Sequence, residues 1–378
     1  MIVAIFYNLK ENLLKRVLVV DWLDKFGGAE RVIAKLEQVF GFGKIYALTN
    51  VMKLSDLNKI ANGRKIEIET TFLQVFGNVF RMLFFTFHYF ITKIKIEKTA
   101  QTIISSSHAV AKGVLKSHEE QLHISYFQAR NFKYIWDDAP LYFGKLLFLV
   151  KPLINYLQKV DFKQAQKPDY IISNSKFVQQ WVKEKYKRDS VVIYPPVALD
   201  DFPLECEKED YYVAVGRIVA YKRFDLIVKA FKNSNKKLIV LGDGAELEKL
   251  KSIATSNIQF TGFVDSSTVQ RYISKAKAFI HIGVEDFGIA PIEAQSCGTP
   301  VIAFKAGGIL ETVLDGKTGL FFEKQTEDSL LTAIESFELK KWDPIQIHKH
   351  AQSFSENRFV DEINAYVSNC ENVFFFQT

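Results

Sequence analysis

The chain of 378 residues, 48% of them hydrophobic, is long and apolar enough for two or three globular domains, each with its own core. Its cysteines, Cys206, Cys297 and Cys370, are odd in number and far apart, which argues against a disulfide framework or a zinc site and favours a reducing cytosol. The net charge is +6, and no basic cluster with interleaved aromatic residues marks a nucleic-acid-binding element, so nucleic acid is not an expected partner.

The charge is divided unevenly along the chain. Residues 1–193 contain 29 Lys/Arg and 17 Asp/Glu, a net charge of +12, whereas the remainder contains 20 and 26, a net charge of −6. A basic first half indicates that one domain meets an anionic surface, either membrane lipid or a phosphorylated carrier. The sequence shows no secretory signal and no apolar run of roughly 20 residues, so we expect a cytoplasmic protein that is at most peripheral on the cytoplasmic face of the inner membrane.

Strands and helices are expected to alternate in the first half. Arg16 to Asp21 is predicted as a buried strand, followed by a turn over 26–30 that contains Gly27 and Gly28 and by a helix from Arg31. The later strands are expected at 66–68, 102–105, 124–127, 170–172 and 191–194. This alternation predicts a parallel sheet.

An aromatic segment precedes the strand at 102–105. It contains Phe72, Phe76, Phe80, Phe84 and Phe87, followed by Lys93, Lys95 and Lys98. Helical spacing of aromatic residues favours a core helix. The lysines keep a second interpretation open, in which the segment is an interfacial membrane element.

A linker is predicted at the pair Pro195-Pro196 and the acidic run 205–210, because paired prolines cannot continue an ordinary strand or helix. Beyond it, the strand and helix pattern begins again. Strands are expected at 211–215, 237–241, 258–262, 278–282 and 300–304, with helices at 225–232, 245–253 and 267–276. The chain is therefore expected to contain two domains of similar architecture.

The sequence from Glu285 to Glu293, EDFGIAPIE, places two carboxylates eight positions apart between a strand and a helix. Gly288, Ile289 and Ala290 are expected to form a turn before a helix that begins at the following proline, with their amides facing an anion. Glu293 then falls in the first helical turn and Glu285 on the loop, so both line a crevice of the kind in which open α/β sheets bind ligands. The alternative is that Glu293 only complements the helix dipole and Glu285 is solvated.

The longer string EDFGIAPIEAQSCGTPVIAFKAGGILETV resembles the signature of retaining GT-B glycosyltransferases of family 4, especially their mannosyltransferase branch. The resemblance implies an α/β fold of two Rossmann-like domains facing a central cleft. The acceptor-binding domain would be 1–194, with a C-terminal helix at 356–378 crossing back to it, and the donor-binding domain would be 195–355. Residues 1–15 precede the usual start of family members and have no assigned role.

The resemblance also implies roles for single residues. The string VGRIVAYKR is similar to the diphosphate clamp of the family, so Arg217 and Lys222 would stabilise the negative charge of the departing diphosphate. Glu285 is assigned to the donor sugar and Glu293 to the ribose hydroxyls. The other donor-side candidates are Gly27 and Gly28 in FGGAERV, Gly216, Gly288, Ile289 and Ala290, and, near the base, Gly262 and Phe263. Family 4 enzymes usually need no metal, and the sequence has no Asp-x-Asp motif, so we expect no metal or other cofactor beside the nucleotide sugar.

The first half departs from the family pattern at one point. The strings SSSHAVAKG and HISY resemble segments of the mannosyltransferase branch and place His108, Gln128 and Lys133 on the acceptor and sugar side. Gln128 stands where the family usually has a histidine. The identity of the donor sugar is therefore open.

Taken with its resemblance, the chain is expected to be a retaining hexosyltransferase. It would move mannose from GDP-mannose onto a lipid-linked glycan in the biosynthesis of a surface polysaccharide such as lipopolysaccharide. A UDP-sugar donor on the same fold is the first alternative. The second, suggested by Gln128, is a non-catalytic scaffold that binds a nucleotide sugar within a glycan assembly complex.

Overall fold

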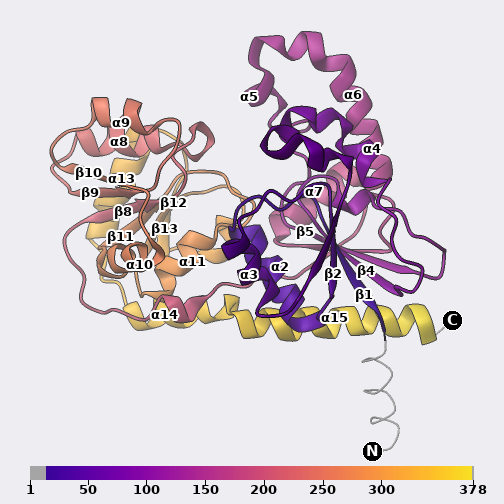
Figure 1. Cartoon of the computed structure of the whole chain (residues 1–378). Coiled ribbons are helices and arrows are strands. Elements are labelled where there is room, and N and C mark those ends of the chain that lie inside the picture. The colour runs from indigo at the N-terminus through magenta and orange to yellow at the C-terminus, as the bar shows by residue number, and fades with distance from the viewer. Residues whose placement is uncertain (1–13, 377–378) are drawn as a thin grey trace, which may run out of the picture. The chain divides into compact units, whose positions relative to one another are not determined.

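The computed structural model describes residues 14–376, which divide into two compact units (Figure 1). The first unit is Met1–Pro195 together with Phe359–Thr378, and the second is Pro196–Arg358. Most of the N-terminal extension expected at 1–15 lies outside the described residues. Within them, none of the helices has both the length and the apolar character of a membrane span.

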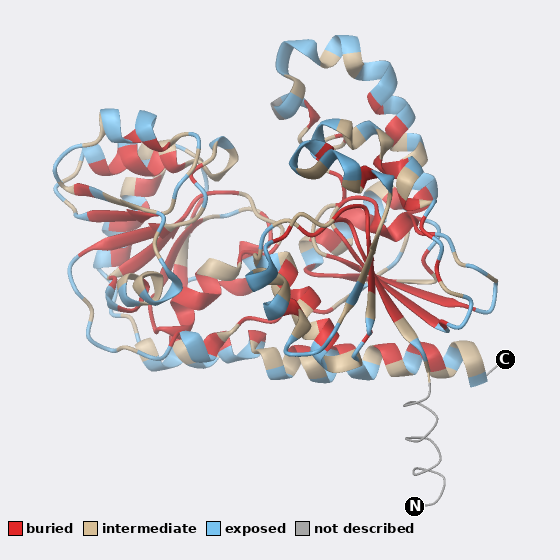
Figure 2. Ribbon diagram, viewed as in Figure 1, coloured by how far each residue is buried: buried red, intermediate tan, exposed pale blue. Residues whose placement is uncertain are grey.

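The first unit is built on a seven-stranded parallel sheet with the strand order β3-β2-β1-β4-β5-β6-β7. Its strands are β1 (Arg16–Val20), β2 (Lys44–Ala47), β3 (Glu67–Thr70), β4 (Thr102–Ser107), β5 (Leu122–Phe127), β6 (Tyr170–Ser173) and β7 (Val191–Val192). Its helices are α2 (Gly28–Phe40), α3 (Leu54–Ala61), η1 (Phe72–Thr86), α4 (Phe87–Ile91), η2 (Ala111–Gly113), α5 (Ala139–Phe143), η3 (Gly144–Leu146), α6 (Leu147–Gln164) and α7 (Lys176–Tyr186). The central strands are buried along their length, as Figure 2 shows in red, because helices cover both faces of a parallel sheet.

The last helix, α15 (Glu356–Phe376), completes the core of the first unit although it comes last in the chain. Its buried residues Phe359, Ile363 and Val367 recur every four positions and pack in one hydrophobic cluster with β1 and β4. Near its end, Glu371 accepts two hydrogen bonds from Arg16 at 2.8 and 2.6 Å and one from the Thr102 hydroxyl at 2.8 Å.

The second unit repeats the scheme with a six-stranded parallel sheet in the order β10-β9-β8-β11-β12-β13. Its strands are β8 (Tyr212–Val215), β9 (Leu238–Leu241), β10 (Ile258–Gly262), β11 (Ala278–His281), β12 (Val301–Phe304) and β13 (Gly319–Phe322). Its helices are η4 (Leu199–Asp201), η5 (Ala220–Lys222), α8 (Phe224–Lys232), α9 (Leu247–Ile253), α10 (Ser266–Lys275), α11 (Ile289–Ser296), α12 (Ile309–Thr312), α13 (Glu327–Glu338), α14 (Pro344–Ala351) and η6 (Gln352–Phe354).

Two helix starts differ from the sequence prediction. Helix α2 begins at Gly28 rather than Arg31, because Gly27 is its N-cap and the Glu30 carboxylate accepts a hydrogen bond from the Gly27 N–H at 3.0 Å. Helix α11 begins at Ile289 rather than Pro291, so 288–290 is not a turn. Gly288, with φ 91°, is the N-cap, and the proline is tolerated because the first four N–H groups of a helix have no partner within it.

The aromatic segment is not a regular core helix, so the favoured prediction is only partly right. Segment η1 has non-helical backbone at Gly77 and Leu83. Phe80 and Phe87 are buried beside Trp22, whereas Phe72 is 64% exposed. One side of the segment therefore belongs to the core and the other faces solvent.

Candidate active site

The candidate site of the second unit lies where its strand order reverses. The chain runs from β8 outward through β9 to β10 and then returns to the other side of β8 with β11. The loops that leave the carboxyl ends of β8 and β11 therefore diverge around one point, which is where open α/β sheets hold their ligands. The first loop carries Arg217 and Lys222, and the second carries Glu285.

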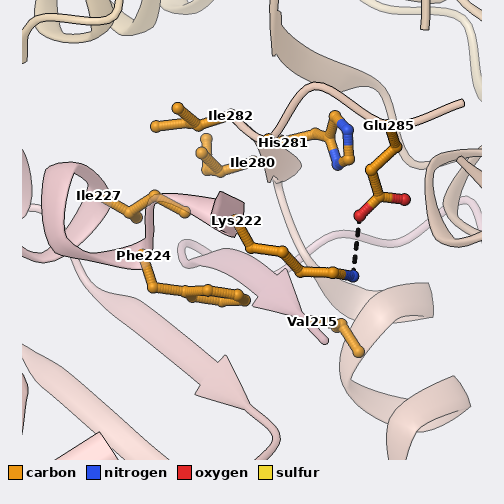
Figure 3. A pocket seen from close by; sticks show the side chains of 9 residues that line it. Val215, Lys222, Phe224, Ile227, Ile280, His281, Ile282 and Glu285 are labelled. Carbon is orange, nitrogen blue, oxygen red and sulfur yellow. Dashed lines mark ion pairs between the residues drawn. The ribbon is translucent and has the colours of Figure 1, made fainter. Parts of the chain in front are cut away.

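Lys222 and Glu285 meet at this point. Their side chains form an ion pair with Nζ and Oε1 2.8 Å apart, and both are partly exposed, at 21% and 23% (Figure 3). Lys222 Nζ also lies over Gly216, only 3.0 Å from the place where a Cβ atom on that glycine would sit. The structure thus brings together the glycine, the lysine and the glutamate that sequence analysis assigned to a donor site.

The loop that carries Glu285 is held by a neighbouring pair of glycines. Gly308 N–H donates to the Glu285 carbonyl at 2.9 Å. A Cβ on Gly308 would lie 2.5 Å from the Asp286 carbonyl oxygen, and one on Gly307 would lie 2.6 Å from that of Glu285. Only glycine allows the loop after β12 to approach so closely, so this pair fixes the position of the carboxylate.

A third loop supports the lysine from the side of β9. Gly216 N–H donates to Leu241 O at 3.0 Å, and Ile218 N–H donates to Asp243 O at 2.9 Å. Gly242 has φ +136°, and a Cβ there would lie 1.9 Å from the Gly216 carbonyl oxygen. The loop 216–222 therefore depends on the absence of a side chain at 242.

We accordingly expect Gly242→Ala to destabilise the second unit more than Gly262→Ala. Both glycines have positive φ, but a Cβ on Gly262 would meet nothing within 4 Å. The Gly262→Ala control should lower the free energy of unfolding only by the left-handed backbone strain, about 1–2 kcal/mol. In Gly242→Ala, the overlap of the new Cβ with backbone atoms adds to that strain. Urea denaturation of both variants measures the difference, and equal losses would contradict the account.

His281 is a pocket residue that sequence analysis left unassigned. It ends β11 and lines a small pocket together with Lys222, Glu285 and apolar residues of β8, α8 and β11 (Figure 3). Burial lowers its pKa, because the imidazolium form loses its hydration there. Within residues 14–376 its Nε2 atom has no hydrogen-bond partner. Its place at the carboxyl end of a central strand, four residues before Glu285, was the signal available in the sequence.

The other donor-side candidates are more dispersed. Glu293 is the fifth residue of α11, beyond its first turn, and is buried. Arg217 is exposed, and in the described part of the chain no ion pair joins it to Glu285. Gly262 and Phe263 lie at the end of the edge strand β10, two strands from β8, where Phe263 is 85% exposed. No contact in the structure tests their predicted roles.

The strand order of the first unit reverses between β1 and β4. Asp21, which directly follows β1, lies at this reversal. The Asp21 carboxylate accepts hydrogen bonds from the four successive backbone N–H groups of 108–111 at 2.5 to 2.9 Å. It also lies 3.1 Å from Nδ1 of His108, whose ring packs edge-on against Trp22. The predicted residue His108 is thus oriented by an aspartate that sequence analysis placed only at the end of a strand.

Gln128 and Lys133 are held within the first unit. The Gln128 amide donates to Ser106 Oγ at 2.8 Å and to the Ala29 carbonyl oxygen at 3.4 Å. It therefore ties the end of β4 to the first turn of α2, next to Gly27 and Gly28. Lys133 lies 3.6 Å from Asp138. Gln128 thus supports the start of α2, where Gly27 and Gly28 lie.

Glu30, in the same turn, should make stability depend on pH. Burial raises its pKa from 4.5 to about 7, with nearby Asp24 adding to the shift and Arg81 and the Gly27 N–H opposing it. Because the folded state binds this proton more tightly, the contribution of Glu30 is fully present below pH 4.5 and is lost as the pH rises through 7. We expect Glu30→Gln to flatten the unfolding free energy across this interval. An unchanged pH profile by chemical denaturation would argue against the assignment.

Residues 199–358, which include Lys222, Glu285 and Glu293, match the family described as glycosyl transferases group 1. Residues 199–358 thus belong to the group 1 glycosyltransferases. The family predicted from the string EDFGIAPIEAQSCGTPVIAFKAGGILETV is thereby confirmed for this segment, and its mannosyltransferase branch stays a prediction.

The curated relatives of this chain are distant. An uncharacterized glycosyltransferase of Methanocaldococcus jannaschii is 29% identical over 182 residues, which cover 46% of this chain and 52% of the relative. A GDP-mannose-dependent alpha-(1-6)-phosphatidylinositol monomannoside mannosyltransferase of Mycolicibacterium smegmatis is 30% identical over 140 residues, which cover 32% and 37%. The chain spans about half the length, or less, of these relatives.

A solved structure extends the likeness to nearly the whole chain. Anabaena HepE, in complex with UDP, superposes with a TM-score of 0.65 at 16% identity, covering 94% of this chain and 100% of its own. At that identity the likeness shows the fold alone. It confirms the expected α/β fold of GT-B type, in which two Rossmann-like units are followed by a C-terminal helix.

Proposed function

We propose that the chain is a retaining glycosyltransferase that moves a hexose from a nucleotide sugar to a glycan acceptor. The observation that carries this proposal is the Lys222–Glu285 pair at the strand reversal of the second unit, within the segment that matches the family. The second unit would bind the donor, and the first unit would bind the acceptor.

The proposed chemistry assigns the cations to the leaving group. When the bond between the sugar and the diphosphate breaks, negative charge builds up on the phosphate oxygens, and fixed cationic side chains stabilise it without solvent reorganisation. The ammonium group of Lys222 has three donors, so it can keep Glu285 as a partner while it binds a phosphate oxygen. Arg217, on the same loop, would be the second cation, and no metal ion is assigned a role.

Retention of the configuration at the sugar's C1 would not require a nucleophile from the protein. The C1–O bond to the diphosphate breaks, the acceptor oxygen bonds to C1 on the same face, and the acceptor proton passes to the released phosphate oxygen. Glu285 accepts hydrogen bonds from the donor hexose hydroxyls, and Glu293 would do so from the ribose. The carboxylates thus orient the donor and bind it through its hydroxyl groups.

The donor proposed is GDP-mannose, and the acceptor a lipid-linked glycan of a surface polysaccharide. Support comes from the Mycolicibacterium relative, whose name specifies GDP-mannose and a phosphatidylinositol mannoside. A UDP-sugar is the competing donor, favoured by the UDP bound to HepE. Donor identity is thus a question for direct measurement.

The test is a panel of nucleotide sugars, with GDP-mannose, UDP-glucose, UDP-galactose and UDP-N-acetylglucosamine assayed for thermal stabilisation and slow hydrolysis. A ligand at 100 times its Kd stabilises the folded state by about 2.7 kcal/mol, which should raise Tm by about 5 °C or more. GDP-mannose should give the largest shift. A larger shift with a UDP-sugar would select the alternative donor, stabilisation without turnover would support the scaffold, and no shift from any compound would reject the proposal.

A further inference from the structure

Among residues 14–376, the first unit carries exposed apolar side chains that no other element of the unit covers. They come from two segments, η1 with α4, and α5 through α6, and Figure 2 shows much of both in pale blue. We call this surface the aromatic–lysine face. Its apolar members are Phe72, Val75, Val79, Met82, Phe85 and Tyr89 from the first segment and Tyr142, Leu146, Phe148, Leu149, Leu153 and Tyr156 from the second.

The two segments form one structural element of the first unit. Phe84 of η1 packs against Phe143 of α5 with ring centroids 6.1 Å apart, and Phe87 and Ile154 belong to one hydrophobic cluster. In Figure 1 the labelled helices α4, α5 and α6 lie together at the top of the first unit. The inner side of this element is thus part of the core, and its outer side is available to a partner.

Helix α6 shows most clearly the division between a buried side and an exposed side. Its buried residues Ile154, Leu157, Asp161 and Gln164 recur every three or four positions and form one stripe. At 100° per residue, the opposite side carries aromatic residues interleaved with lysines, and Phe148 is 72% and Tyr156 63% exposed. The lysines of this outer side are Lys151, Lys159 and Lys163. A helix that only faced water would not need large aromatic residues there.

The charge of the face has one sign. Residues 72–100 and 140–168 together contain nine Lys/Arg and two Asp/Glu. Both acids are already engaged, since Asp161 is fully buried against Lys112 and Glu97 is paired with Lys15. Arg81 is paired with Asp24 outside these ranges, which leaves eight lysines. The exposed aromatic residues therefore lie in an unbalanced positive field, which a partner must complement with negative charge.

We propose that the aromatic–lysine face docks the enzyme on an anionic lipid bilayer. Aromatic and aliphatic side chains would enter the headgroup boundary, while the lysines extend along it to the lipid phosphates. Interfaces between proteins are depleted of lysine, so a lysine-rich apolar surface fits a lipid headgroup layer better than a protein partner. This proposal does not depend on the donor or on catalysis, and bilayer binding can be measured on the protein without substrate.

Co-sedimentation with vesicles tests the proposal. The full chain should bind vesicles of phosphatidylglycerol and phosphatidylcholine in equal parts, and hardly any of it should bind phosphatidylcholine alone. The variant Lys151→Glu/Lys159→Glu should bind roughly 30-fold more weakly at least, because each lysine near an anionic surface contributes about 1 kcal/mol. Phe148→Ser/Leu149→Ser should also lose most binding. The control, Leu339→Ser/Lys341→Glu, changes an exposed leucine and an exposed lysine of the second unit and should bind like the wild type.

Three results would overturn the proposal. The first is binding to neutral vesicles as strong as to anionic ones and unaffected by salt. The second is equal binding by the face variants and the control, with circular dichroism showing that all are folded. The third is failure to bind vesicles together with a dimer, seen by light scattering, that Phe148→Ser/Leu149→Ser converts to a monomer, since the face would then be an interface between copies of the chain.

Discussion

Replacing Lys222 with alanine should lower kcat by about 10²- to 10³-fold, the usual loss when one group that stabilises a developing oxyanion is removed. The substitution should leave the fold intact, because the Lys222 side chain is partly exposed and belongs to no hydrophobic cluster of the second unit. Steady-state transfer with the donor that the nucleotide-sugar panel selects gives the measurement. Glu285→Ala should cause a comparable loss, with a larger rise in KM, because it removes contacts to the sugar.

The protein offers a matched control for this pair. Lys305 and Glu323 form another lysine–glutamate ion pair in the second unit, 2.6 Å apart and more exposed, and neither lines the pocket. Lys305→Ala should therefore leave kcat unchanged. Near-normal turnover in both Lys222→Ala and Glu285→Ala, or an equal loss in Lys305→Ala, would reject the site assignment.

The largest loss of stability is expected for Asp161→Asn in the first unit. The Asp161 carboxylate pairs with Lys112 at 2.7 Å, and both side chains are fully buried. It also accepts hydrogen bonds from the Trp136 indole at 2.8 Å and the Tyr186 hydroxyl at 2.6 Å. The amide leaves the lysine charge buried without its counter-ion, which typically costs about 3–5 kcal/mol.

Chemical denaturation followed by tryptophan fluorescence reports this loss, because Trp136 and Trp181 lie within the same cluster of rings. Asp56→Asn is the matched control. Asp56 also pairs with a lysine at 2.7 Å, but on the surface of α3, where water screens the two charges and the pair contributes little to stability. Similar losses in the two variants would show that burial does not set the cost of breaking the pair.

The two loops that meet at the candidate site could be predicted because each is local in sequence. VGRIVAYKR and EDFGIAPIE each follow a strongly apolar strand, so a parallel sheet brings both loops to one edge. The pairing of Lys222 with Glu285 was not predicted. It depends on β8 and β11 being neighbours although β9 and β10 separate them in the chain, and strand order is not encoded in local pattern.

The missed elements share a physical reason. Strands β2 and β13 have four residues each, as β9 and β12 do, but their sequences KIYA and GLFF contain at most one β-branched residue, whereas LIVL and VIAF contain two. The role of Asp21 was invisible for another reason. Its partners are backbone N–H groups almost ninety positions away, and any sequence could supply these groups.

The chain order of the two units has a consequence for biosynthesis. The second unit is continuous from Pro196 to Arg358 and can fold once that stretch has left the ribosome, because domains generally fold as units. The first unit, although translated earlier, waits for Phe359, Ile363 and Val367 to fill its core and for Glu371 to neutralise Arg16. A nascent polypeptide halted before residue 359 would therefore leave the core of the first unit open and need chaperones. Premature termination near the C-terminus should thus destabilise the first unit, although that unit is translated first.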